Sequence, residues 1–78
     1  MSKLPTDASY RKVMKLLIEI GYTPKPKESR GSHVLFEKDG CRSIPVSTSK
    51  IIPQGTLRGI LKQADINRKQ FWDIWNKL

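Results

Sequence analysis

Residues 29–36 read Ser29-Arg30-Gly31-Ser32-His33-Val34-Leu35-Phe36, and they hold the only histidine among the 78 residues of the chain. The alternation of side chains predicts a strand over residues 32–38. Val34 and Phe36 fall on one face of this strand, whereas His33, Leu35 and Glu37 fall on the other. We therefore expect the first face to pack on a core and the histidine to lie on the open face.

A helix is predicted over residues 8–20, in front of this strand. Its apolar side chains recur at the helical period, which is typical of a helix with one buried face; they are Tyr10, Val13, Leu17 and Ile20. Thr6 or Asp7 is expected to cap the first turn. Gly21 is expected to end the helix in the left-handed conformation that glycine tolerates.

The segments on either side of the histidine strand predict a small antiparallel sheet. Pro24 and Pro26 cannot donate ladder hydrogen bonds, so residues 22–28 are expected to form an extended edge segment or a loop. Asp39-Gly40 is typical of a two-residue hairpin turn. A further strand is predicted over residues 41–46, where Pro45 fits only at an edge of the sheet.

Residues 47–54 are predicted to form a loop, and two helices follow it. The second helix is expected to open at Gly55-Thr56, with Thr56 as its cap. Its core-facing stripe consists of Leu57, Ile60, Leu61 and Ala64. Asn67 and Gln70 resemble a capping box at the start of a third helix, whose apolar stripe consists of Phe71, Ile74, Trp75 and Leu78.

Together these elements predict one α+β domain over residues 1–78. The expected order is α-β-β-β-α with an extra C-terminal helix, and the three short strands are expected to pair antiparallel. The helices should cover one face of the sheet. A chain of this length buries only a modest core, so a stable partner chain is a natural source of further stability.

The charge balance is strongly basic, with 15 Lys and Arg against 7 Asp and Glu, which gives a net charge of +8. Such a balance favours a nucleic-acid partner. A solvated basic surface, or a basic patch for an acidic protein, is the alternative that charge alone leaves open.

Other features of the composition restrict the class of protein. No apolar run approaches the roughly 20 residues that span a bilayer, and the N-terminus lacks the apolar segment of a secretory signal. A single cysteine, Cys41, forms no internal disulfide, and together with one histidine it cannot make a zinc site. We expect a cytoplasmic protein with no membrane association and no metal or other cofactor.

Several segments of the chain resemble the HicA family of bacterial and archaeal toxins, which are small mRNA interferases of type II toxin–antitoxin systems. They cover nearly the whole chain in the family's order, and their joint spacing is specific. These segments are residues 13–22, Arg30-Gly31-Ser32-His33-Val34-Leu35-Phe36, Ile44-Pro45-Val46, residues 55–64, and Ile66-Asn67-Arg68-Lys69-Gln70-Phe71.

The resemblance implies a fold like that of a double-stranded-RNA-binding domain (dsRBD), with a three-stranded antiparallel sheet packed against helices. It implies a ribonuclease activity that depends on the strand histidine, here His33, and a HicB-like antitoxin that covers the active surface. Many members carry a second histidine after the Pro-Val of the third strand, and this chain has Ser47 there.

RNA cleavage by a 2′-hydroxyl requires a proton acceptor, positive charge on the phosphate and a proton donor for the leaving oxygen. Histidine suits the proton transfers, because its ordinary pKa of about 6.5 lies near neutrality. The candidate phosphate-binding residues are Lys25, Lys27, Arg30, Ser32, Arg42 and Lys50. This chemistry needs no metal, and only Glu37 and Asp39 are carboxylates near the histidine, so we expect a metal-independent enzyme.

Two other functions remain open at the level of the sequence. A lone strand histidine is more often an ordinary hydrogen-bonding residue, so it is the resemblance that favours catalysis by His33. A non-catalytic basic RNA-binding module is the first alternative, and it predicts salt-sensitive RNA binding without cleavage. An interaction protein that only docks an acidic partner is the second, and it predicts no RNA binding.

Overall fold

The computed structural model describes residues 3–78, with the backbone alone for residues 26–30. Its helices are α1 (Tyr10–Glu19), α2 (Gln54–Gln63) and α3 (Arg68–Trp75). Its strands are β1 (Ala8–Ser9), β2 (Thr23–Arg30), β3 (His33–Glu37), β4 (Ile44–Ser47) and β5 (Ile51–Ile52).

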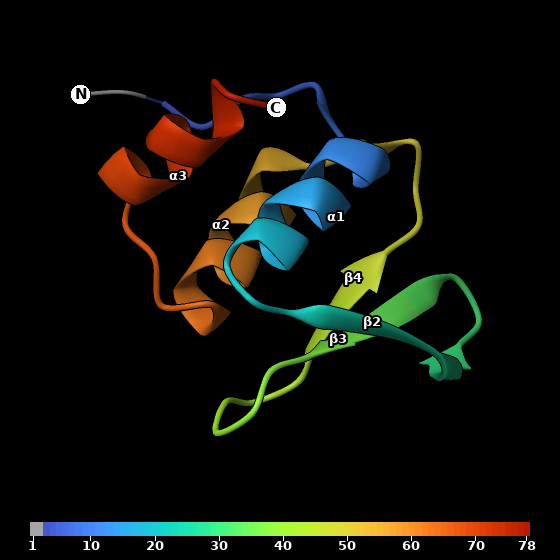
Figure 1. The fold of residues 1–78 in the computed structure, drawn as a ribbon. Helices are drawn as coiled ribbons and strands as arrows, with labels where there is room; N and C mark the ends of the chain where they lie inside the picture. Colours follow the sequence, from blue (N-terminus) through green and yellow to red (C-terminus); the bar gives the residue numbers. More distant parts are fainter. Residues whose placement is uncertain (1–2) are drawn as a thin grey trace.

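The three longer strands form an antiparallel sheet in the order β2-β3-β4, and the helices gather on one side of it (Figure 1). This arrangement confirms the predicted α+β class, with one three-stranded antiparallel sheet and an additional C-terminal helix. It is consistent with a dsRBD-like fold.

Helix α1 begins at Tyr10, because the two residues before it pair with β5 as the short strand β1. The prediction of Thr6 or Asp7 as the cap is wrong. Ser9 caps the helix, and its Oγ accepts a hydrogen bond from the Lys12 backbone N–H at 3.2 Å. Gly21 follows the helix with φ of 104°, as predicted.

The β3–β4 hairpin has a longer connection than the sequence predicts. The Cys41 N–H donates to the Lys38 carbonyl at 3.0 Å, which closes a turn around Asp39-Gly40. Strand pairing nevertheless resumes only at Ile44, opposite Phe36. The prediction of a strand from residue 41 is therefore wrong at its start, since residues 41–43 are exposed and Ile44 is the first that reaches the core.

Strand β4 lies at the edge of the sheet, so Pro45 meets the condition that its missing N–H imposes. Residues 47–54 are not the plain loop that the sequence predicts. They contain β5, which pairs antiparallel with β1 in a separate two-stranded sheet. Two paired residues are too few for alternation to reveal.

Helix α2 begins at Gln54 with Pro53 at its N-cap, so the prediction of Thr56 as a cap is wrong. Proline is tolerated there because the first turn of a helix has no use for its missing N–H. The capping box of α3 is confirmed. Asn67 Oδ1 accepts from the Gln70 N–H at 2.8 Å, and Gln70 Oε1 accepts from the Asn67 N–H at 2.9 Å.

One hydrophobic core joins the N-terminal segment, all three helices and the inner face of the sheet. Its largest fully buried side chains are Phe36, Phe71, Leu16, Leu17, Ile44, Ile52, Leu57, Val13 and Val46. In the described part of the chain no polar or charged residue is buried, so the excess positive charge lies at the surface. None of the described helices combines the length and the apolar character that crossing a membrane requires.

Candidate functional site

His33 is the first residue of β3 and lies at one end of the central strand of the sheet. The chain reaches it through a turn in which Gly31 has φ of 57°, a conformation that glycine adopts without strain. Arg30 of β2 is its partner on one side, and Ser47 of β4 is its partner on the other. We refer to these three residues as the His33 site.

The alternation predicted for β3 is confirmed by burial. Phe36 is fully buried and Val34 packs against the core, whereas His33 is exposed to solvent. The imidazole therefore lies on the face of the sheet that the helices leave open. Side chains at paired positions of neighbouring strands lie on the same face, so Ser47 shares this face with His33.

The connection that follows β4 holds the backbone next to His33 in place. The carbonyl of Ser32 accepts two hydrogen bonds from Thr48, one from the N–H at 2.7 Å and one from Oγ1 at 2.9 Å. The hydroxyl oxygens of Ser47 and Ser49 are 2.7 Å apart, and the Ser49 N–H also donates to Ser47 Oγ at 3.2 Å. The ends of β3 and β4 are thus joined by side chains as well as by the ladder.

The predicted phosphate-binding residues are distributed unevenly around the histidine. Ser32 is adjacent to it, and Lys50 follows β4 by three positions. Lys25 is exposed on β2, opposite Leu35 and therefore farther along the sheet. The side chains of Lys27 and Arg30 lie outside the described residues, so Arg30 is placed beside His33 by its backbone alone.

Arg42 is the predicted residue that the fold places farthest from His33. It is exposed in the connection between β3 and β4, at the opposite end of the hairpin. Five strand residues at about 3.3 Å each separate the two ends by roughly 15 Å. The structure therefore does not bring Arg42 together with the His33 site.

A hollow that the sequence did not predict lies beside this site. Its volume is about 340 Å³, and we call it the Tyr10 hollow; it is lined by Ser9, Tyr10, Arg11, Thr48 and Lys50. The sequence pattern places Tyr10 on the core-facing stripe of its helix and Arg11 off that stripe. Only the packing of α1 against the β4–β5 connection brings them to Thr48 and Lys50, so no local signal in the sequence could have found them.

Residues 10–66 match a family model described as HicA toxin of bacterial toxin-antitoxin. The chain belongs to the HicA toxin family. The match runs from the start of α1 through the whole three-stranded sheet and α2. A comparison with curated proteins found no match to the chain. The family establishes the protein as the toxin of a toxin–antitoxin system, and such a system supplies an antitoxin as its partner.

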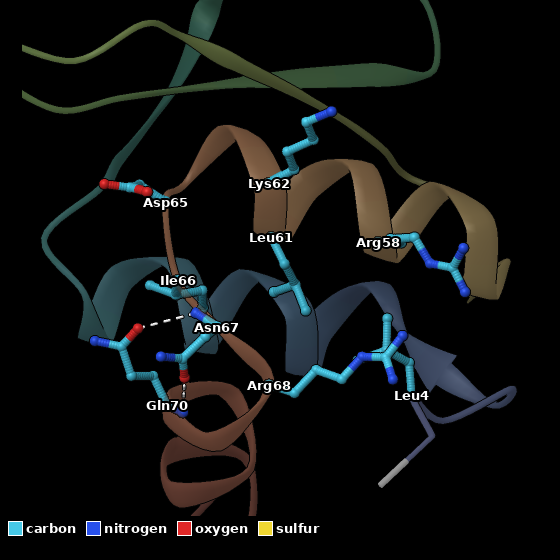
Figure 2. A pocket seen from close by; sticks show the side chains of 9 residues that line it. All are labelled: Leu4, Arg58, Leu61, Lys62, Asp65, Ile66, Asn67, Arg68 and Gln70. Atoms are coloured by element: carbon cyan, nitrogen blue, oxygen red, sulfur yellow. Dashed lines mark hydrogen bonds between the residues drawn. The ribbon is translucent and has the colours of Figure 1, made fainter. Parts of the chain in front are cut away.

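A second hollow of the toxin lies on a different part of its surface. This groove, of about 430 Å³, is formed by α2, the start of α3 and Leu4. Figure 2 shows that Arg58 and Arg68 both extend toward the Leu4 end of the groove, and that the capping box of α3 closes its other side. Helix α3 lies at the far end of the molecule from the β2–β3 turn (Figure 1), so the groove is separate from the His33 site.

Among the residues that the structure describes, no three histidine, cysteine or acidic side chains gather in a group that could hold a metal ion. The described side chains next to His33 in sequence or register include the hydroxyls of Ser32 and Ser47, and the basic residue Lys50 follows β4 by three positions. These groups suit the binding of a phosphodiester more than the binding of a metal ion.

Proposed function

We propose that this toxin is an endoribonuclease of the mRNA interferase kind, with His33 as general acid and base. The observation that carries the proposal is the position of His33. It is an exposed imidazole on the open face of the central strand, with Arg30 and Ser47 as its cross-strand neighbours. Membership of the HicA family supports the same activity.

The proposed reaction is an attack by the ribose 2′-oxygen on the adjacent phosphorus. His33 accepts the proton of the 2′-hydroxyl, a 2′-O–P bond forms, and the P–O5′ bond breaks. The imidazolium then returns the proton to the leaving 5′-oxygen, so the products are a 2′,3′-cyclic phosphate and a 5′-hydroxyl. A positioned acid or base of this kind contributes typically about 10²- to 10⁴-fold to a rate.

The cations near His33 are proposed to bind the RNA backbone and to stabilise the charge that develops on the phosphate. Arg30, Lys27 and Lys50 are the nearest along the fold, with Ser32 as a further contact. Lys25 and Arg42 are proposed to contact the RNA farther along the sheet. Because the nucleophile is the 2′-hydroxyl of the RNA and not a metal-bound water, the proposed reaction requires no metal ion.

We propose a HicB-like protein as the antitoxin, and the open face of the sheet as its docking surface. Covering His33 and the cations proposed to bind the RNA backbone blocks access of RNA, which is sufficient to silence the toxin. In this proposal residues 1–78 act as one toxin domain on mRNA in the cytoplasm.

The test is induced expression of the wild type beside His33→Ala, followed by cleavage assays with the two purified proteins. We expect growth arrest and loss of mRNA for the wild type only, with products that carry a cyclic phosphate and with no effect of EDTA. Lys15→Ala, which removes an exposed charge from α1, is the matched control and should behave as the wild type.

Equal RNA loss from wild type and His33→Ala rules out catalysis by His33. RNA binding without cleavage by either protein favours a non-catalytic RNA-binding module. No RNA binding by the isolated toxin favours a protein that only docks an acidic partner.

A further inference from the structure

The Tyr10 hollow lies where the first turn of α1 meets the connection between β4 and β5. Its volume of about 340 Å³ falls at the lower end of the range for small-molecule sites, which is about 300–1,000 Å³. A hollow of this size has room for one base of a nucleic acid, but not for a longer segment.

The residues that line the hollow include one aromatic residue, Tyr10, and two basic residues, Arg11 and Lys50. Tyr10 is half-buried and packs against the hydrophobic core, which holds its ring in place before any ligand arrives. Arg11 and Lys50 are both exposed. None of the described residues that line the hollow is acidic. A fixed aromatic ring beside cations is the pattern with which proteins bind single-stranded nucleic acid, because bases stack on the ring and phosphates pair with the cations.

Thr48 connects the hollow to the His33 site. It follows Ser47, the cross-strand partner of His33, and it donates two hydrogen bonds to the carbonyl of Ser32. Neighbouring strands lie about 4.8 Å apart, so this wall of the hollow lies within a residue or two of the histidine. Both hydrogen-bond donors of Thr48 are used in these bonds. Thr48 therefore forms a fixed part of the hollow, and a ligand is bound by the other residues that line it.

The N-terminus of α1 does not by itself make the hollow a binding site. Ser9 Oγ already accepts a hydrogen bond from the first turn of the helix, at the Lys12 N–H. The features that suit the hollow to a ligand are the ring, the two cations and the contact with the backbone next to His33.

We propose that the Tyr10 hollow binds a nucleotide of single-stranded RNA that flanks the cleaved bond. The base lies against the ring of Tyr10, and its phosphate lies on Arg11 and Lys50. This inference rests on the proposed ribonuclease function and deepens it. A second, fixed contact beside His33 holds the scissile phosphate in register with the imidazole, which an exposed histidine on an open sheet cannot do alone.

The first experiment measures RNA binding in the His33→Ala background, so that the RNA stays intact. The probe is a short labelled single-stranded RNA that the wild type cleaves, and the readout is fluorescence anisotropy. Tyr10→Ala should weaken binding about 5- to 150-fold, which corresponds to the loss of one stacked base. Tyr10→Phe keeps the ring and should bind within about twofold of its parent.

The second experiment removes the charges, which are exposed and can be changed without disturbing the core. Arg11→Ala with Lys50→Ala should make the slope of log affinity against log salt shallower by about 0.7 for each phosphate that the variant no longer neutralises. Lys15→Ala removes one exposed charge from the same helix outside the hollow, and it should leave the slope unchanged.

A third measurement separates stacking from a merely structural effect of Tyr10. With a ribose–phosphate oligomer that lacks bases, Tyr10→Ala and its parent should bind equally, whereas a loss of folding would weaken both probes alike. Equal affinities of Tyr10→Ala, the charge variant and the parent for the intact RNA overturn the inference.

The same series separates failure of the inference from failure of the proposed function. If the parent binds no RNA, both the proposed function and the inference are wrong. If the wild type cleaves RNA and the hollow variants bind RNA normally, only the inference is wrong. If the hollow variants weaken the complex with the antitoxin but leave RNA binding intact, the hollow is a protein interface and the inference is wrong.

Discussion

Ser47 lies directly opposite His33 across the β3–β4 pair. Side chains at such paired positions have Cβ atoms about 4.5–5.5 Å apart, so any group at position 47 can reach a phosphate bound at the imidazole. The Ser47 hydroxyl is engaged with Ser49, whose Oγ is 2.7 Å away. An aliphatic hydroxyl is a very weak acid near neutral pH, so Ser47 is a poor proton donor to a leaving group, which leaves the acid–base work of the proposed reaction to His33.

Replacing Ser47 by histidine should therefore increase the rate of RNA cleavage. The new imidazole faces His33 and can protonate the leaving 5′-oxygen while His33 accepts the proton of the 2′-hydroxyl. We expect the initial rate to rise by about 10-fold or more, since a separate general acid contributes about 10²- to 10⁴-fold when it is well placed. The measurement is single-turnover cleavage of a labelled RNA.

Two controls test whether the increase in cleavage rate depends on the pairing of position 47 with His33. Ser47→Ala removes the same hydroxyl without adding an imidazole, and it should not increase the rate. In the double variant His33→Ala with Ser47→His the gain should disappear. A double variant as fast as Ser47→His would mean that the new histidine acts alone and that the pairing with His33 is irrelevant.

The relation between these two positions also marks the limit of what the sequence could predict. The burial of Phe36 and the exposure of His33 follow from alternation alone. A two-residue turn at Asp39-Gly40, however, would pair His33 with Val46. That register would turn Ile44 and Val46 away from the core. The observed register is shifted by one residue, so that Ile44 and Val46 face the core and Ser47 comes opposite His33.

Burial of two aliphatic side chains outweighs the preference of a turn dipeptide, because each contributes about 1.5–3 kcal/mol. The same limit applies to β1, β5 and the Tyr10 hollow. They arise from contacts between segments that lie far apart in the sequence, such as Ala8 with Ile52. Local periodicity carries no information about such contacts, whereas it did predict the helix stripes and the capping box.

The stability of the toxin should fall as the pH rises above 10, because of Tyr22. This side chain is buried, and burial is the main cause that raises the pKa of its phenol above 10.0, with Cys41 adding to the shift. The unfolded chain loses the phenol proton first. The contribution of Tyr22 is therefore complete below pH 10 and declines as the pH rises from there toward the higher pKa of the folded state.

The measurement is chemical unfolding of wild type and Tyr22→Phe between pH 8 and pH 11 at fixed ionic strength. Lysine titration affects both proteins equally, so the difference between them isolates the phenol. The wild type should lose stability relative to Tyr22→Phe above pH 10. A constant difference across this range would show that the phenol titrates alike in the folded and unfolded chains.

Loss of the capping box should destabilise the whole domain and not α3 alone. Asn67→Ala removes the bond to the Gln70 N–H and should cost about 1 kcal/mol, within a usual range of about 0.5–2 kcal/mol. For a domain of this size that lowers the melting temperature by about 4–8 °C. Because Phe71 of α3 is fully buried in the shared core, a single transition is expected in a thermal melt.

Gln70→Ala should cost less than Asn67→Ala, and the double variant should cost less than the sum of the two, since the two bonds are reciprocal. Lys69→Ala is the matched control in the same turn, because its side chain is exposed. Two separate transitions in Asn67→Ala would show that α3 unfolds independently of the rest.

Trp72→Phe should leave the toxin as stable as the wild type or stabilise it by up to about 1 kcal/mol. The Trp72 ring meets Phe71 edge-on, with centroids 5.1 Å apart, and a phenylalanine can keep that contact. The buried indole Nε1–H has no hydrogen-bond partner among the described residues. An unsatisfied buried donor costs about 1–3 kcal/mol, and removing it offsets the free-energy cost of the cavity that the lost ring atoms leave.

Trp75→Phe is the comparison, because the Trp75 ring stacks on Phe71 with centroids 4.9 Å apart and its centroid lies 4.4 Å from Lys12 Nζ. We expect it to lose more than about 1 kcal/mol through weaker packing. Urea unfolding of the two variants measures the difference, and an equal loss in both would mean that the Trp72 indole N–H is not a cost to the fold.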